Sequence, residues 1–112
     1  MGSTSHLGLI FIYKQLPMLG HGEWKDVFRA VQDGNLELVG FYLRLGIEVN
    51  YQHPEYLTGF IHESIRRKNI QMLELLITSG ADIRLIEVES GKTPLQLAHE
   101  FHFSEAIALL GS

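Results

Sequence analysis

The chain has 112 residues, enough for one small domain or one short array of repeats. Hydrophobic residues make up 46% of it and charged residues 20%, which excludes wholesale intrinsic disorder. The net charge of −4 gives no indication of nucleic-acid binding, and the absence of cysteine excludes disulfide scaffolds, thiol catalysis and cysteine zinc sites.

Positions 1–23 show no regular pattern, and we expect an irregular capping segment there. Residues 7–13 are apolar at nearly every position but lack the flanking features of a signal peptide. No run approaches the roughly 20 apolar residues of a membrane helix, so we expect a cytoplasmic protein that contacts no membrane. We expect residues 7–13 to cover the apolar side of the first helical unit. The alternative is an arm for self-association or for partner binding.

Helix-turn-helix patterns then follow three times, in units placed at about residues 24–57, 58–91 and 92–112. In the first unit, Gly34 suits a helix end that needs a left-handed residue, and Gly46 closes the second helix. In the second unit Lys68 replaces Gly34, at a small conformational cost because it carries a Cβ, and Gly80 replaces Gly46.

The third unit opens with Thr93, whose hydroxyl can cap a helix, and Pro94, which fits the first helical position. In this unit His102 stands at the left-handed turn position that Gly34 and Lys68 occupy in the first two units. The interval that separates Gly46 from Gly80 relates the three units throughout, so that Leu73 corresponds to Ile107. We expect Leu73 to be fully buried, because only the middle unit has a neighbour on each side.

Residues 91–98, Gly-Lys-Thr-Pro-Leu-Gln-Leu-Ala, resemble the opening of the ankyrin repeat, Thr-Pro-Leu-His-x-Ala. Residues 76–82, Leu-Ile-Thr-Ser-Gly-Ala-Asp, are similar to the end of its second helix. The likeness covers about Trp24 to Leu110. It implies an all-α solenoid of about three helix pairs with short finger loops, at residues 51–58 and 84–92, which binds another protein through its concave side without catalysis or cofactor.

Each unit departs from the family pattern in part. Only His62 keeps the family histidine, which in such proteins ties neighbouring turns together through hydrogen bonds, and Gln96 stands at that position in the third unit. Terminal repeats of an array are commonly atypical because one face meets water, so we interpret the first and third units as caps.

Neither a metal site nor an enzyme is expected. His99 and His102 are separated by one position fewer than the zinc motif His-Glu-x-x-His requires, and no third ligand is indicated. No glycine-rich phosphate loop or nucleophile elbow occurs. Four glutamates fall mostly at positions that the repeat assigns to exposed helix faces: Glu37, Glu63, Glu74 and Glu105. Acid–base catalysis is not expected of them, because it needs a carboxylate that is buried or close to another charge.

Tyrosine, arginine and apolar residues on the finger loops are typical of binding hot spots. The alternative is that Tyr56, Leu85 and Val88 fold back onto neighbouring repeats. The basic run 66–68 either stabilises a helix C-terminus or anchors an acidic partner, and both roles are compatible. The predicted partner-binding residues are Arg29, Gln32, Asp33, Tyr51, His53, Tyr56, Glu63, Arg66, Arg67, Arg84, Leu85, Ile86 and Val88.

The expected function is therefore a non-enzymatic protein-binding module. Two alternatives remain open at this stage. One is a small acidic inhibitor or immunity protein that occludes a basic toxin or enzyme, for which a steep salt dependence of association is the expected sign. The other is a fragment of a longer ankyrin scaffold.

Overall fold

The structure, a computed structural model, describes residues 19–111, with side chains from Glu23 onward. Within this part of the chain all regular elements are helices: α2 (Leu19–Asp33), α3 (Leu36–Arg44), α4 (Phe60–Arg66), α5 (Ile70–Thr78), α6 (Pro94–Glu100) and α7 (Ser104–Gly111). Helix α2 begins at Leu19, so the end of the segment expected to be irregular is helical. The expectations for residues 7–13 lie outside the described residues.

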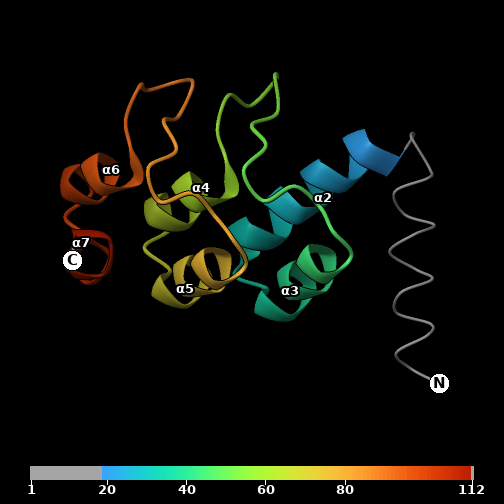
Figure 1. Cartoon of the computed structure of the whole chain (residues 1–112), viewed down its shortest axis with the longest axis horizontal. Coiled ribbons are helices and arrows are strands. Elements are labelled where there is room, and N and C mark those ends of the chain that lie inside the picture. The colour runs from blue at the N-terminus through green and yellow to red at the C-terminus, as the bar shows by residue number, and fades with distance from the viewer. Residues whose placement is uncertain (1–18, 112) are drawn as a thin grey trace.

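The helices form two parallel rows (Figure 1). Helices α2, α4 and α6 pack side by side in one row, and α3, α5 and α7 pack in the other. Each helix of the first row also packs on its successor in the chain. The two finger loops rise beside the row of first helices, at the top of the picture. The expected all-α solenoid of three helix pairs is confirmed.

The turns inside and after the helix pairs follow the sequence prediction. Gly34, Lys68 and His102 have φ angles of 72°, 52° and 54°, so each of the three helix pairs turns through a left-handed residue. Gly46 and Gly80, with φ angles of 98° and 101°, end the second helices of the first two units. The repeat thus holds at the level of single backbone angles.

Side chains cap three of the described helices, one of them as predicted. Thr93 accepts a hydrogen bond from the N–H of Gln96, and the Gln96 side chain accepts one from the Thr93 N–H, which confirms the predicted start of α6. Asn35 and Asn69 cap α3 and α5 in a similar way, accepting from the N–H of Leu38 and of Met72. These bonds satisfy donors that a helix leaves free at its N-terminus.

The middle unit forms the centre of the core. Residues 60–65 of α4 are all buried. Leu73 has no solvent exposure, as expected, whereas Ile107 in the last unit is only partly buried. A linear stack produces this difference, because the middle unit is covered on both sides.

Candidate functional site

Trp24 on α2 anchors the first finger. Its indole N–H donates a hydrogen bond to the Tyr51 carbonyl at 3.1 Å. Its ring stacks on Phe28 at 4.8 Å between centroids and meets the edge of Tyr56 at 5.1 Å. His53 packs against the same indole at 5.2 Å and is only 5% exposed. The finger is therefore fixed to the first helix row by an aromatic cluster.

His62 on α4 fixes the second finger. Its Nδ1 accepts a hydrogen bond from the Gly59 N–H at 3.2 Å, and its Nε2 lies 2.8 Å from the Leu85 carbonyl oxygen. Because a backbone N–H only donates and a carbonyl only accepts, the ring is neutral with its proton on Nε2. Burial lowers the pKa of His62, which favours the same neutral form. The role that the ankyrin resemblance implies for this histidine is confirmed.

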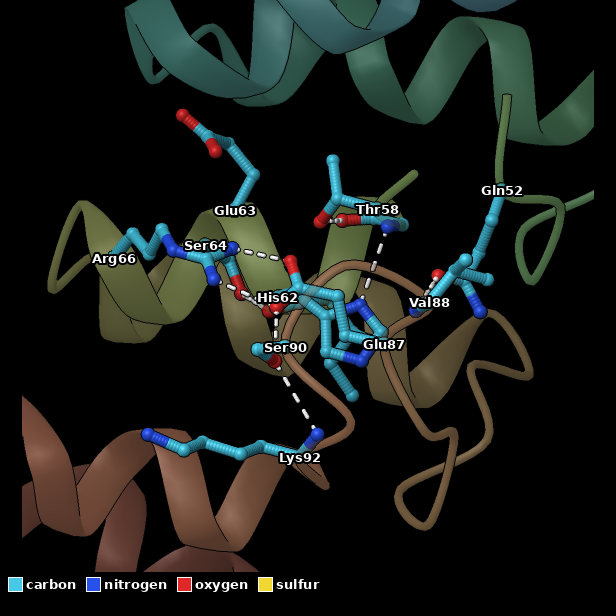
Figure 2. Close-up of polar contacts among 12 residues, drawn as sticks. Gln52, Thr58, His62, Glu63, Ser64, Arg66, Glu87, Val88, Ser90 and Lys92 are labelled. Atoms are coloured by element: carbon cyan, nitrogen blue, oxygen red, sulfur yellow. Dashed lines mark hydrogen bonds and ion pairs between the residues drawn. The ribbon is translucent and has the colours of Figure 1, made fainter. Parts of the chain in front are cut away.

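An ion pair between the buried carboxylate of Glu87 and the partly exposed guanidinium of Arg66 lies beneath the second finger (Figure 2). Arg66 Nη2 donates to Glu87 Oε1 at 2.6 Å, and its Nη1 donates to Oε2. The Ser90 hydroxyl donates to Oε1 at 2.5 Å. Burial favours a raised pKa for Glu87, but hydrogen bonds from Arg66, Ser90 and Thr58 outweigh it and lower the pKa to about 2. Arg66, predicted as a partner contact, is thus engaged within the chain.

Gln52 joins the two fingers through its side-chain amide. Its Nε2 donates to the Ile86 carbonyl and its Oε1 accepts from the Val88 N–H, both at 2.9 Å. Asn50 bonds the backbone of Gly80 and Asp82 in the same two-way manner, at 3.4 and 2.7 Å. The first repeat therefore holds the backbone of the second, and the second finger is braced from α4 and from the first finger.

The braced fingers expose a set of large apolar side chains, which we call the finger platform: Tyr51, Tyr56, Leu57, Ile86 and Val88. Ile86 and Val88 are the most exposed of these, at 59% and 61%. Tyr56 both contacts the Trp24 cluster and remains accessible, and Leu85 is partly buried against the core. Leu85 thus folds back onto the core, as the alternative expects. Tyr56 does so only in part, and Val88 does not.

Two predicted contact residues lie inside the protein. Glu63 is only 7% exposed, so its expected position on an exposed helix face is wrong; Arg67 Nε donates to its carboxylate at 2.9 Å. His53 is buried under the first finger and does not form its tip. The two have different causes: Glu63 is on a helix that has a neighbouring unit on each side, whereas His53 is in a loop and packs against Trp24 and Tyr56 of its own repeat.

The other predicted residues surround the platform or the adjoining helices. Arg29 and Asp33 are exposed on α2, Gln32 is partly buried between them, and Arg67 and Arg84 are exposed at the end of α4 and at the start of the second finger. The sequence reasoning missed Gln52, Trp24 and Glu87. An acidic residue between Ile86 and Val88, both apolar, was a weak signal for an inward-facing charge.

Other kinds of site receive no support from residues 19–111. No group of three or more histidine, aspartate or glutamate side chains is arranged there to hold a metal ion. Across the same residues, every helix is too short or too polar to cross a membrane.

Comparison with known proteins agrees with this geometry. The family profile of ankyrin repeats, in three copies, matches residues 27–112. The chain is 34% identical over 76 residues, 68% of its length, to ARF GTPase-activating protein GIT1 of Homo sapiens, and 36% identical over 76 residues, again 68% of its length, to GIT2 of Mus musculus. It is 32% identical over 72 residues, 64% of its length, to BRCA1-associated RING domain protein 1 of Caenorhabditis elegans.

The matched regions cover 10%, 11% and 10% of GIT1, GIT2 and the Caenorhabditis elegans protein, so the chain corresponds to a small part of each. Ankyrin repeats are protein-interaction modules and are generally non-catalytic. With three repeats matched over most of its length and the helix pairs, turns and histidine bonds of such repeats in place, the chain belongs to the ankyrin repeat family.

Proposed function

We propose that this chain binds a partner protein through the finger platform and the adjoining row of first helices, without catalysis or cofactor. The observation that carries the proposal is the exposure of Ile86 and Val88, at 59% and 61%, on a backbone that Gln52 holds between them. Large apolar side chains gathered at a surface are typical of interaction sites, because burying them in a complex releases water.

The bracing of the fingers favours affinity. Binding costs entropy wherever it orders a loop or a side chain, on the order of 1 kcal/mol for each immobilised side chain. The second finger is already held at Leu85, Ile86 and Val88 by bonds from the rest of the fold. A partner therefore meets a preorganised surface and spends little of the interaction energy on ordering it.

The polar residues near the platform supply its rim. Arg29, Asp33, Arg67 and Arg84 are exposed, and typical interfaces surround an apolar centre with such groups. The partly covered residues offer smaller contact areas: Gln32, Arg66 and Leu85. The two buried residues support the surface without contacting a partner. His53 packs against Trp24, and Glu63 accepts a hydrogen bond from the exposed Arg67.

Affinity capture from the source organism tests this proposal, with proteins identified by mass spectrometry. The test variant is the double substitution Ile86→Asp and Val88→Asp, which places charges on the platform but leaves the backbone bonds to Gln52 available. Ala108→Asp, at an exposed position on α7, is the matched control. We expect a captured protein that the control retains and the platform variant loses. Capture by both variants alike contradicts the proposal.

A second candidate function rests on the net charge of −4. An acidic module of this size can occlude the binding or active site of a basic protein, as an inhibitor does. Association with such a partner is steered by charge and slows steeply as salt is raised. An association rate that is insensitive to salt favours the neutral interaction module over the inhibitor.

A further inference from the structure

The two finger loops contain the same backbone turn, but with different residues at its left-handed position. In the second finger the Gly91 N–H donates to the Glu87 carbonyl at 2.8 Å. In the first finger the Leu57 N–H donates to the His53 carbonyl at 2.7 Å. Leu57 and Gly91 are matching positions of the repeat, and their φ angles are 58° and 72°. The first finger therefore carries a leucine where the second carries a glycine.

A leucine is strained in this conformation, whereas a glycine is not. A left-handed backbone brings the Cβ of an L-residue too close to the following carbonyl oxygen. At Gly91 an added Cβ would meet no atom within 4 Å, so the strain at this turn comes from the backbone angle and not from crowding. The Leu57 carbonyl also accepts a hydrogen bond from the Glu89 N–H at 3.0 Å, which helps to hold the residue in place. The fold thus bears a cost at Leu57 that a glycine would remove.

The leucine side chain does not offset this cost by full burial. Leu57 remains 39% exposed, as a member of the finger platform. Glu89, which is bonded to it through the backbone, is exposed as well. The finger carboxylates of Glu55 and Glu87 are both in ion pairs, whereas Glu89 is in none of those found among residues 23–111. A strained apolar residue and an acidic residue outside any ion pair are therefore neighbours on the platform.

We propose that Leu57 anchors the partner contact, and that it enters an apolar pocket of the partner protein whose rim carries a basic side chain. This inference rests on the function proposed above and adds the shape and charge of the surface that the platform meets. A leucine fixed on a braced turn enters a pocket without a further ordering cost. Burial there removes its remaining exposed area from water, and the strongest contacts of an interface lie in such desolvated pockets. The charge of Glu89 then meets an opposite charge at the edge of the contact.

The melting temperature of Leu57→Asn tests whether the leucine serves the fold. Asparagine adopts a left-handed backbone more readily than leucine, so the melting temperature should rise or stay within about 2 °C of that of the original chain. Gly91→Ala calibrates the turn, because it adds a Cβ at the matching position and should lower the melting temperature. A larger fall for Leu57→Asn overturns the proposal, since the side chain is then needed for folding. An unchanged value for Gly91→Ala also overturns it, since the turn then imposes no strain.

Binding is measured by surface plasmon resonance, with the protein identified in the affinity capture above as the probe. Leu57→Asn should raise the dissociation constant about 30-fold or more. Leu38→Asn is the matched control, because it makes the same change at a leucine that is 38% exposed on α3, and it should leave the constant unchanged. Glu89→Gln should slow association and reduce its dependence on salt, whereas Glu105→Gln, at an exposed position on α7, should do neither.

The outcomes separate this inference from the proposed function. If Leu57→Asn binds as tightly as the original chain while the double variant at Ile86 and Val88 does not bind, the inference is overturned and the proposed function stands. Equal weakening by Leu57→Asn and Leu38→Asn also overturns it. An association rate that Glu89→Gln leaves unchanged overturns the basic rim of the pocket. If the capture finds no protein that the double variant loses, the proposed function fails and this inference fails with it.

Discussion

The guanidinium of Arg66 binds both carboxylate oxygens of Glu87, although the Glu87 side chain has no exposure to solvent. The pair joins the end of α4 to the middle of the second finger, 21 residues away along the chain. A buried carboxylate without its cation is costly, because its hydration is not replaced. The ion pair therefore makes the position of the finger depend on α4.

Replacing Arg66 by alanine should lower the free energy of unfolding by about 3–5 kcal/mol at pH 7, since Glu87 is left buried and charged. Lys92→Ala is the control: it removes a cation from an exposed pair with Glu100, whose atoms are 2.7 Å apart, and should cost about 0–1 kcal/mol. Urea denaturation measures both values. Equal losses in the two variants would show that Glu87 is not held as the structure has it.

The stability of the protein should also depend on pH through Glu87. Its pKa is about 2 in the folded chain, below the ordinary value of 4.5, so the folded state holds the proton less tightly than the unfolded state. This contribution is fully present above about pH 4.5 and is lost as the pH falls toward 2. Its size is on the order of 3 kcal/mol.

Urea midpoints of the original chain and of Glu87→Gln, measured from pH 7 to pH 2.5, check this expectation. The variant should be less stable at pH 7 and should show a shallower decline, so that the two curves converge in acid. Parallel curves would assign the acid sensitivity to other carboxylates.

The repeat was predictable because it rests on local chemistry. Lys68 and His102 turn left-handed where Gly34 does, and Thr93 with Pro94 begins α6, since backbone angles and caps depend on near neighbours in sequence. Because matching positions are separated by a constant interval, a turn recognised in one unit predicts the turns of the other two.

The inward-facing polar residues of the fingers were not predictable in the same way. Glu87 is buried by a partner 21 residues earlier, and Gln52 bonds the backbone of the next finger at Ile86 and Val88. The fingers have no helical period that would predict which side chains face the fold. Glu63 was misplaced for a related reason: helix periodicity describes one helix, and its burial comes from the units packed around it.

His62→Gln should separate the two bonds that His62 makes. The glutamine can still accept from the Gly59 N–H, as Gln96 accepts from Thr93 at 2.9 Å, but the bond to the Leu85 carbonyl is lost. We expect a cost of about 1–3 kcal/mol at pH 7 for the unsatisfied carbonyl.

The same variant tests the titration of this histidine. Burial lowers the pKa of His62, so its contribution to stability is present above about pH 6.5 and is lost as the pH falls below that value. The glutamine variant should therefore lose less stability than the original chain between pH 7 and pH 5. Identical pH profiles would contradict a buried, neutral His62.

Leu73→Ala should cost about 2–5 kcal/mol, because it leaves a cavity at the centre of the stack. Ile107→Ala, at the matching position of the last unit, should cost less because Ile107 is only partly buried. Denaturant midpoints with unchanged slopes measure the difference. Equal losses would argue against a linear stack.

Gln52 reaches the second finger through the Ile86 carbonyl and the Val88 N–H, and makes no use of the side chains at those positions. Any amino acid other than proline at position 88 retains these backbone groups. The side chains at positions 86 and 88 can therefore change without loss of the hydrogen bonds that hold the finger backbone. If the second finger binds a partner as proposed, a library randomised at positions 86 and 88, without proline at 88, varies the contact surface and keeps the two backbone bonds to Gln52.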